Sequence, residues 1–136
     1  MDFALRHVGI CVGDLDRSIR FYGEGLGFVV TERYDLEREM AEINGTARVT
    51  LQFLERGATR IELLAFAEPR PVGSPSAVRN QLGLTHLCFV VPDVHAATVH
   101  LVDCGGTLVV GSQPGADPPT AFVSDPDGTR IELIGT

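Results

Sequence analysis

The sequence contains an internal duplication. The segment TRIELL at 59–64 returns as TRIELI at 129–134, and the segment HVGICVGD at 7–14 corresponds to HLCFVVPD at 86–93. In both copies an aspartate stands seven positions after a histidine, and a glycine stands twenty positions after it. Self-similarity of this kind predicts that the chain contains two copies of one supersecondary unit.

Each copy predicts the same order of elements. A short run rich in β-branched residues ends at Asp14 in the first copy and at Asp93 in the second, as a strand does before a helix N-cap. Apolar residues then recur at helical spacing, and the pair Gly105-Gly106 is a stop signal for the second helix. Two strands joined by a tight turn close each copy, so that each copy is predicted to be a βαβββ module.

The duplication also predicts the domain organisation. The 136 residues form a single domain that contains a first module at 1–67 and a second at 84–136. The Pro-rich segment 68–83 is predicted to be a linker with a short helix, and the segment 31–45 is predicted to be a loop.

Composition excludes several classes of partner. A net charge of −7 argues against binding to nucleic acid or anionic lipid, because both require a basic surface. No apolar run is long enough to span a membrane, and no secretory signal precedes the first module, so a cytoplasmic location is predicted. Cys11, Cys88 and Cys104 form no C-x-x-C pair and are predicted to be small buried side chains in a reducing compartment.

Four residues of the repeat could carry chemistry. Alternation along the strands separates the apolar face of each sheet from His7, Glu62, His86 and Glu132, which are expected on the face without helices. Any one of them could be a satisfied core histidine or a solvated glutamate, but all four lie at equivalent positions of the duplication. Two imidazoles and two carboxylates suit one divalent ion such as Zn, Co, Ni, Mn or Fe(II), so a metal site is predicted.

The quoted segments, together with GLTHLCFVVPD and FVSDPDGTRIEL, resemble the vicinal oxygen chelate superfamily, and the resemblance spans nearly the whole chain. That superfamily includes glyoxalase I, methylmalonyl-CoA epimerase, extradiol dioxygenases and bleomycin resistance proteins. The resemblance implies an α+β fold in which two tandem βαβββ modules form an open, incomplete barrel-like sheet around one metal. It also implies that His7, Glu62, His86 and Glu132 are the ligands, and that the protein is a homodimer.

The resemblance further implies a class of reaction. Four protein ligands are similar to those of glyoxalase I and methylmalonyl-CoA epimerase, which move a proton α to a carbonyl through a metal-stabilised enediolate. The chain is therefore expected to be an isomerase, epimerase or glyoxalase-like lyase acting on a small-molecule carbonyl or acyl-thioester substrate. Glu132 and Glu62 are candidate bases, and Glu42 resembles the position of a second epimerase acid/base. Glutathione is disfavoured as a substrate component, because Cys11 and Phe66 stand where glyoxalase I has Arg and Asn.

Several alternatives stay open. The same fold could serve a small-molecule binding protein for antibiotic sequestration, resistance or sensing. An extradiol dioxygenase is disfavoured, because the metal site of those enzymes has no ligand at the position that corresponds to Glu62. Arg60 and Arg130 lie on the predicted site face, where they could meet an anionic substrate or neutralise acidic neighbours. His95 and His100 fall inside the second helix and are not expected to bind metal.

Overall fold

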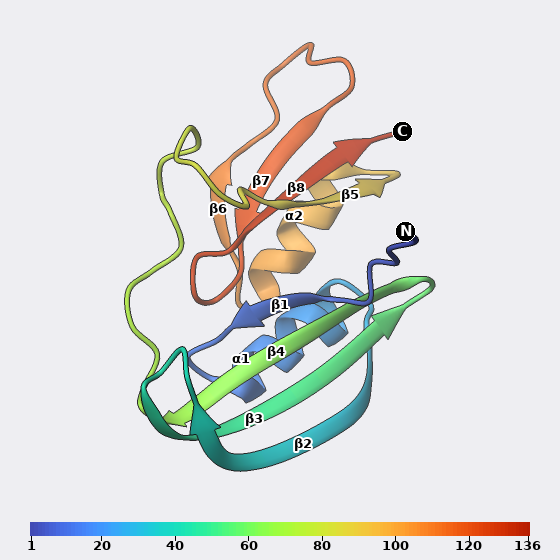
Figure 1. The fold of residues 1–136 in the computed structure, drawn as a ribbon. Helices are drawn as coiled ribbons and strands as arrows, with labels where there is room; N and C mark the ends of the chain where they lie inside the picture. Colours follow the sequence, from blue (N-terminus) through green and yellow to red (C-terminus); the bar gives the residue numbers. More distant parts are fainter. The chain divides into compact units, whose positions relative to one another are not determined.

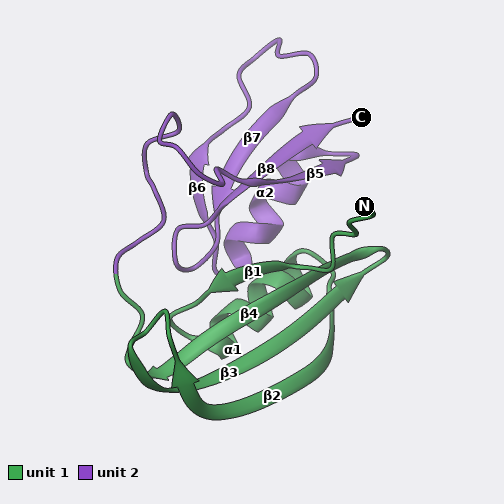
Figure 2. Cartoon of the chain, in the orientation of Figure 1, with its two compact units in different colours: residues 1–72 green, residues 73–136 purple.

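The computed structural model describes all residues from 1 to 136, and the chain divides into two compact units. The first unit is Met1–Val72 and the second is Gly73–Thr136, coloured separately in Figure 2. The change from one unit to the other therefore falls inside the segment 68–83, where the sequence predicts a linker.

The first unit is a four-stranded mixed sheet with helices on one face (Figure 1). The strand order is β1-β4-β3-β2, with β1 parallel to β4 and the other neighbours antiparallel. The elements are β1 (Val8–Cys11), α1 (Leu15–Ile19), the π-helix η1 (Arg20–Gly25), β2 (Val29–Met40), β3 (Gly45–Arg56) and β4 (Thr59–Glu68).

The second unit repeats this topology. The strand order is β5-β8-β7-β6, with β5 parallel to β8, and α2 packs against β6, β7 and β8. The elements are β5 (Leu87–Val91), α2 (Val94–Asp103), β6 (Thr107–Val110), β7 (Thr120–Ser124) and β8 (Arg130–Gly135). The predicted α+β fold of two βαβββ modules is confirmed, and each four-stranded sheet is open at both edges.

Side-chain caps explain where the helices begin and end. The Asp14 carboxylate accepts a hydrogen bond from the Arg17 backbone nitrogen at 3.0 Å, and Asp93 accepts one from Ala96 at 2.9 Å. At the other end of α2 the backbone turns through Gly105, whose φ of +101° favours glycine. The amide of the next glycine donates to the Leu101 carbonyl, which closes a Schellman motif.

The apolar side of each sheet is buried, and strand alternation leaves the polar positions on the other side. Ile61 and Leu63 of β4 are buried, as are Ile131 and Leu133 at the equivalent positions of β8. Glu62 and Glu132, which alternate with them, stay partly exposed. The buried core residues include Phe21, Tyr22 and Leu54 in the first unit, and Leu101 and Val123 in the second.

Three local predictions are wrong. The segment 31–45 is mostly β2 rather than a loop, because its backbone pairs with β3 although both faces of the strand are largely exposed. No helix forms in 68–83, where Glu68 ends β4 and the residues after it form turns, bends and irregular backbone. Of the three free cysteines only Cys104 is buried, whereas Cys11 and Cys88 are exposed on their strands.

None of the helices combines the length and apolarity that crossing a bilayer requires. The longest helix, α2, has ten residues.

Candidate functional site

In the first unit the structure brings two of the predicted ligands together. His7 lies immediately before β1, and Glu62 lies on β4 opposite Gly9 in the parallel ladder. The imidazole Nε2 of His7 is 3.4 Å from a carboxylate oxygen of Glu62. The side chains keep 30% and 13% of their surface exposed, so the pair is partly buried but open to a small ligand.

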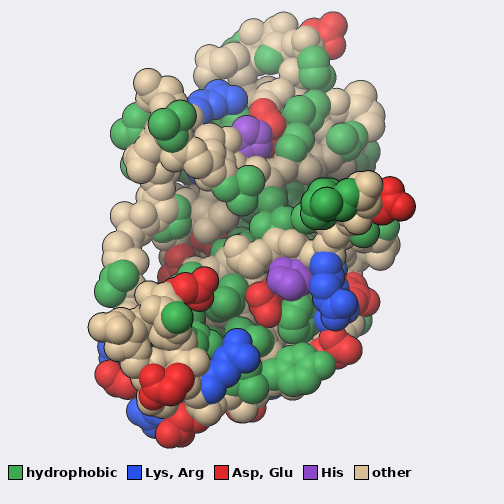
Figure 3. Space-filling model, in the orientation of Figure 1, with side chains coloured by type: hydrophobic (Ala, Val, Ile, Leu, Met, Phe, Trp, Pro, Cys, Tyr) green, Lys and Arg blue, Asp and Glu red, His purple; other side chains and the backbone are tan.

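In the second unit His86 and Glu132 form the equivalent pair. His86 precedes β5 by one residue, and Cys88 lies opposite Glu132 in the β5–β8 ladder. The imidazole Nε2 of His86 is 3.0 Å from a carboxylate oxygen of Glu132, with side-chain exposures of 26% and 14%. In each unit a histidine with acidic atoms beside it reaches the surface shown in Figure 3. Identical ladder registers thus build the same two-residue arrangement twice.

Each histidine–glutamate pair lies against a phenylalanine that sequence reasoning missed. Phe53 on β3 is directly opposite Glu62, and its ring centre is 5.5 Å from that of His7 in an edge-to-face arrangement. Phe122 on β7 is likewise opposite Glu132, 5.6 Å from His86. A triad of histidine, glutamate and phenylalanine therefore occurs once in each unit, and the rings supply an apolar wall beside the polar pair.

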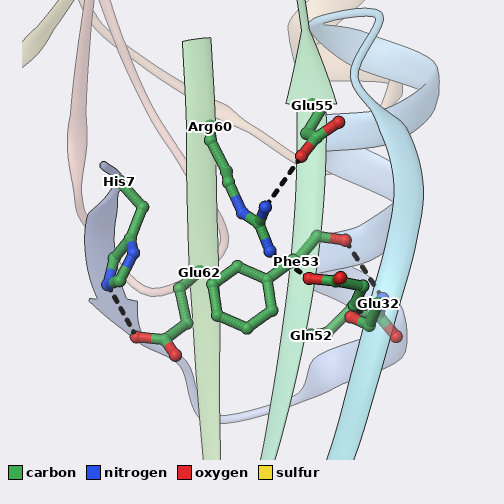
Figure 4. A network of polar contacts seen from close by, with 7 residues as sticks. All are labelled: His7, Glu32, Gln52, Phe53, Glu55, Arg60 and Glu62. Carbon is green, nitrogen blue, oxygen red and sulfur yellow. Dashed lines mark hydrogen bonds and ion pairs between the residues drawn. The ribbon is translucent and has the colours of Figure 1, made fainter. Parts of the chain in front are cut away.

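The arginine predicted near the first pair is neutralised by its neighbours. Arg60 places its guanidinium 4.2 Å from the centre of the Phe53 ring. It forms an ion pair with Glu55 at 3.1 Å and another with Glu32, as Figure 4 shows. Arg60 thus has two carboxylate partners on the site face, which favours the second of the two roles that the sequence left open.

In the second unit a different arginine occupies the corresponding place. Arg130, the repeat counterpart of Arg60, donates a hydrogen bond to the backbone carbonyl of Ala77 in the preceding segment. Arg79, which comes from that segment rather than from a strand, lies 4.5 Å from the centre of the Phe122 ring. No sequence signal marked Arg79, because its position has no counterpart in the first module.

The two histidines differ at their second ring nitrogen. The Nδ1 atom of His86 is 2.7 Å from the hydroxyl oxygen of Thr85. The Nδ1 atom of His7 is buried without a hydrogen-bond partner, and Arg6 stands where the second module has Thr85. One ring is therefore oriented by its preceding residue and the other is not.

A thiol lies beside the carboxylate of the second pair. Three effects raise the pKa of the Cys88 thiol above its ordinary value. Partial desolvation is the largest, and it is followed by the hydrogen bond between the thiol and Glu132 and by the negative charge of that glutamate. The thiol of the metal-free protein therefore stays protonated at neutral pH. The first unit has Gly9 in this place, where a Cβ atom would lie 3.6 Å from Glu62 and 3.3 Å from Leu64.

The four predicted ligands are thus brought together as two pairs. No group of three or more His, Cys, Asp or Glu side chains is placed to hold a metal ion. The donor chemistry nevertheless fits a divalent metal in each pair, because a partly buried imidazole nitrogen and a carboxylate oxygen already point toward one another. Each unit accordingly offers two donors.

Three other residues lie away from these pairs. Glu42 is exposed in the turn between β2 and β3, and β3 begins at Gly45. Phe53 comes eight positions after Gly45 along the extended strand, a path of about 26 Å, so the structure does not bring Glu42 to the His7–Glu62 pair. His95 and His100 are exposed on α2.

Comparison with known proteins gives consistent matches. The family model described as the Glyoxalase/Bleomycin resistance protein/Dioxygenase superfamily matches residues 4–133. A probable lactoylglutathione lyase of Synechocystis is 31% identical over 97% of this chain and 95% of its own. The mitochondrial methylmalonyl-CoA epimerase of Mus musculus is 31% identical over 71% of this chain, which spans about half (51%) of that protein. The crystal structure of a glyoxalase family protein from Bacillus cereus has a TM-score of 0.84 at 25% identity and covers 99% of this chain and 95% of its own.

Proposed function

Since the chain belongs to the glyoxalase/bleomycin resistance protein/dioxygenase superfamily, we propose that it is a metal-dependent isomerase, epimerase or lyase that moves a proton next to a carbonyl. The observation that carries this proposal is the repeated His–Glu pair, held in the same ladder register in both units. The relatives named as a lyase and as an epimerase support this choice of reaction class.

The proposal assigns His7, Glu62, His86 and Glu132 to one divalent metal. When bound, such an ion supplies Lewis-acid stabilisation of the negative charge that develops on a carbonyl oxygen as its α-proton leaves. Two neutral imidazoles and two carboxylates form a donor set that balances a divalent charge and suits Zn, Co, Ni, Mn or Fe(II).

The chain's own residues handle the proton. A carboxylate oxygen of Glu62 or Glu132 accepts the α-proton from the substrate carbon and returns it to another position or to the other face. Phe53 and Phe122, which lie opposite the two glutamates and against the two histidine rings, form apolar walls that limit the access of water to the reacting carbon. The substrate is a small carbonyl compound or acyl thioester. The proposal further includes a homodimer and a cytoplasmic location.

Metal content tests the proposal directly. Elemental analysis of protein purified without chelator or affinity-tag metal is expected to give about one divalent ion per chain. Glu62→Ala is expected to bind the ion at least about tenfold more weakly, because it removes one of the four donors. Glu42→Ala removes the same kind of side chain from an exposed turn and serves as the matched control with unchanged affinity. Absence of metal in every variant, with none taken up on titration, would leave a binding protein of the same fold.

The hydrogen bond between Thr85 and His86 leads to a second prediction. When the neutral ring carries its proton on Nδ1, it donates to the Thr85 hydroxyl and leaves the Nε2 lone pair free for the metal. Thr85→Val keeps the shape of the side chain but removes the oxygen, so we expect about tenfold weaker metal binding in competition with a chelating dye. Thr85→Ser retains the hydroxyl and should restore the affinity. Equal affinities for the valine and serine variants would contradict this role.

A further inference from the structure

We propose that Arg79 is an anion-binding residue beside the second His–Glu pair, and that the substrate carries a carboxylate or phosphate group in addition to its carbonyl. The inference rests on the proposed function for the identity of the carbonyl site, but the anion site itself depends only on residues of the second unit. It begins from the 4.5 Å contact between the Arg79 guanidinium and the Phe122 ring.

Phe122 links the arginine to the candidate site. The same ring lies 5.6 Å from the His86 ring and stands directly opposite Glu132 in the β7–β8 ladder. A cation that rests on this ring is therefore within reach of a small molecule whose other end occupies the His86–Glu132 pair. The guanidinium's planar fork of donors matches a carboxylate or a phosphate in two-point contact.

The charge of Arg79 is not matched by the protein. No Asp or Glu oxygen lies within ion-pair distance of it, whereas Arg60, over the equivalent ring of the first unit, is paired with both Glu32 and Glu55. Figure 4 shows how those two carboxylates use the donors of Arg60. The two units thus place a cation on equivalent rings but leave only the second cation available for an anionic ligand.

The segment that carries Arg79 is held on the second unit at two other points. The guanidinium of Arg130 donates to the Ala77 carbonyl, two residues before Arg79. Pro75 lies so close to the β7–β8 turn that a Cβ atom on Gly128 would be 3.6 Å from it. These contacts give the exposed arginine a defined place over Phe122, which reduces the conformational entropy lost when an anion binds.

The positive charge of Arg79 also offsets the negative charge around the candidate site. The chain carries a net charge of −7, and the candidate site itself contains carboxylates. An anionic substrate would be repelled on approach unless a nearby positive charge offset this field.

The test compares a charged substrate with its neutral ester. We would measure the exchange of α-protons for deuterium in 2-oxobutanoate and in methyl 2-oxobutanoate, using the metal-loaded protein. Arg79→Ala is expected to lower kcat/KM for the acid by roughly 10- to 100-fold, the usual weight of a charge-assisted hydrogen bond, and to leave the ester unchanged. Arg79→Lys should recover part of the loss. Arg70→Ala removes another exposed arginine of the preceding segment and should leave both substrates unaffected.

A binding measurement on metal-free protein separates the two proposals. Calorimetric titration with 2-oxobutanoate and with inorganic phosphate is expected to show binding. Arg79→Ala should abolish this binding and Arg70→Ala should retain it. The probe that binds more tightly identifies whether the substrate's acid group is a carboxylate or a phosphate. Binding that depends on Arg79 without any proton exchange would keep the anion site and reject the reaction. Exchange or binding that is the same in wild type and Arg79→Ala would overturn the anion site while leaving the proposed function intact.

Discussion

Replacing both Glu62 and Glu132 with glutamine is expected to lower the rate of α-proton exchange by about 10²–10⁴-fold. Glutamine keeps the size and much of the hydrogen bonding of each side chain but cannot accept the proton. Exchange into a panel of 2-oxo acids, aldehydes and acyl thioesters in D₂O, followed by NMR, measures the loss. Each variant is assayed at saturating metal so that weaker metal binding is not mistaken for loss of the base.

The single variants then identify the base. The substitution that accounts for most of the loss marks the carboxylate that takes the proton, and the other marks a residue that only binds. Glu42→Gln is the matched control, because Glu42 is exposed in the β2–β3 turn far along the strand from Phe53. Full activity in the double variant, or a loss confined to Glu42→Gln, would reject the assignment of the base to either paired glutamate.

Phe21→Ala is expected to lower the free energy of unfolding by about 3–5 kcal/mol, the range for removing a fully buried aromatic side chain. Phe21 has no exposed surface and meets the Tyr22 ring edge-to-face at 5.3 Å. The loss is a large part of the roughly 5–15 kcal/mol that stabilises an ordinary domain. Urea unfolding followed by circular dichroism measures it.

Phe3→Ala supplies the matched control for that substitution. Phe3 keeps 89% of its surface exposed in the segment before β1, so its removal should change the unfolding free energy by less than about 0.5 kcal/mol. Comparable losses for the two variants would contradict the burial of Phe21 in the core of the first unit.

The sequence predicted the parts of the site that depend on periodicity. A strand places alternate side chains on opposite faces, so the apolar neighbours of Glu62 and Glu132 were sufficient to assign both glutamates to the face without helices. The duplication then related each glutamate to a histidine at the start of its module. The structure places the members of the two pairs 3.4 and 3.0 Å apart.

The errors occurred where backbone pairing rather than side-chain pattern decides the structure. The stretch VVTERYDLEREM lacks an alternating apolar face, because β2 is an edge strand with most side chains in solvent, and its strand form comes from the ladder with β3. The short helix predicted in 68–83 does not form. Three prolines precede the polar stretch there, which is held instead by contacts such as that of Ala77 with Arg130.

The phenylalanines were missed because the two copies are out of step by one residue. Phe53 precedes Glu62 by nine positions, whereas Phe122 precedes Glu132 by ten, since the turn between β7 and β8 is longer than the turn between β3 and β4. Alignment through the strands rather than through the residue numbers would have matched them. Arg79 could not be found this way, because its place over Phe122 depends on how the segment before β5 lies on the second unit.

The division of the donors between two compact units makes the connecting segment part of any site that uses all four. Each unit supplies one histidine and one glutamate, and the chain passes from the first unit to the second between Val72 and Gly73. A short connecting segment keeps the two groups of donors that it joins at an effective concentration in the millimolar range. If the proposed ion uses all four donors, its apparent affinity depends on the length and stiffness of the connecting segment as well as on the ligands. An insertion in this segment is then expected to weaken the binding of the ion without changing any of the four donors.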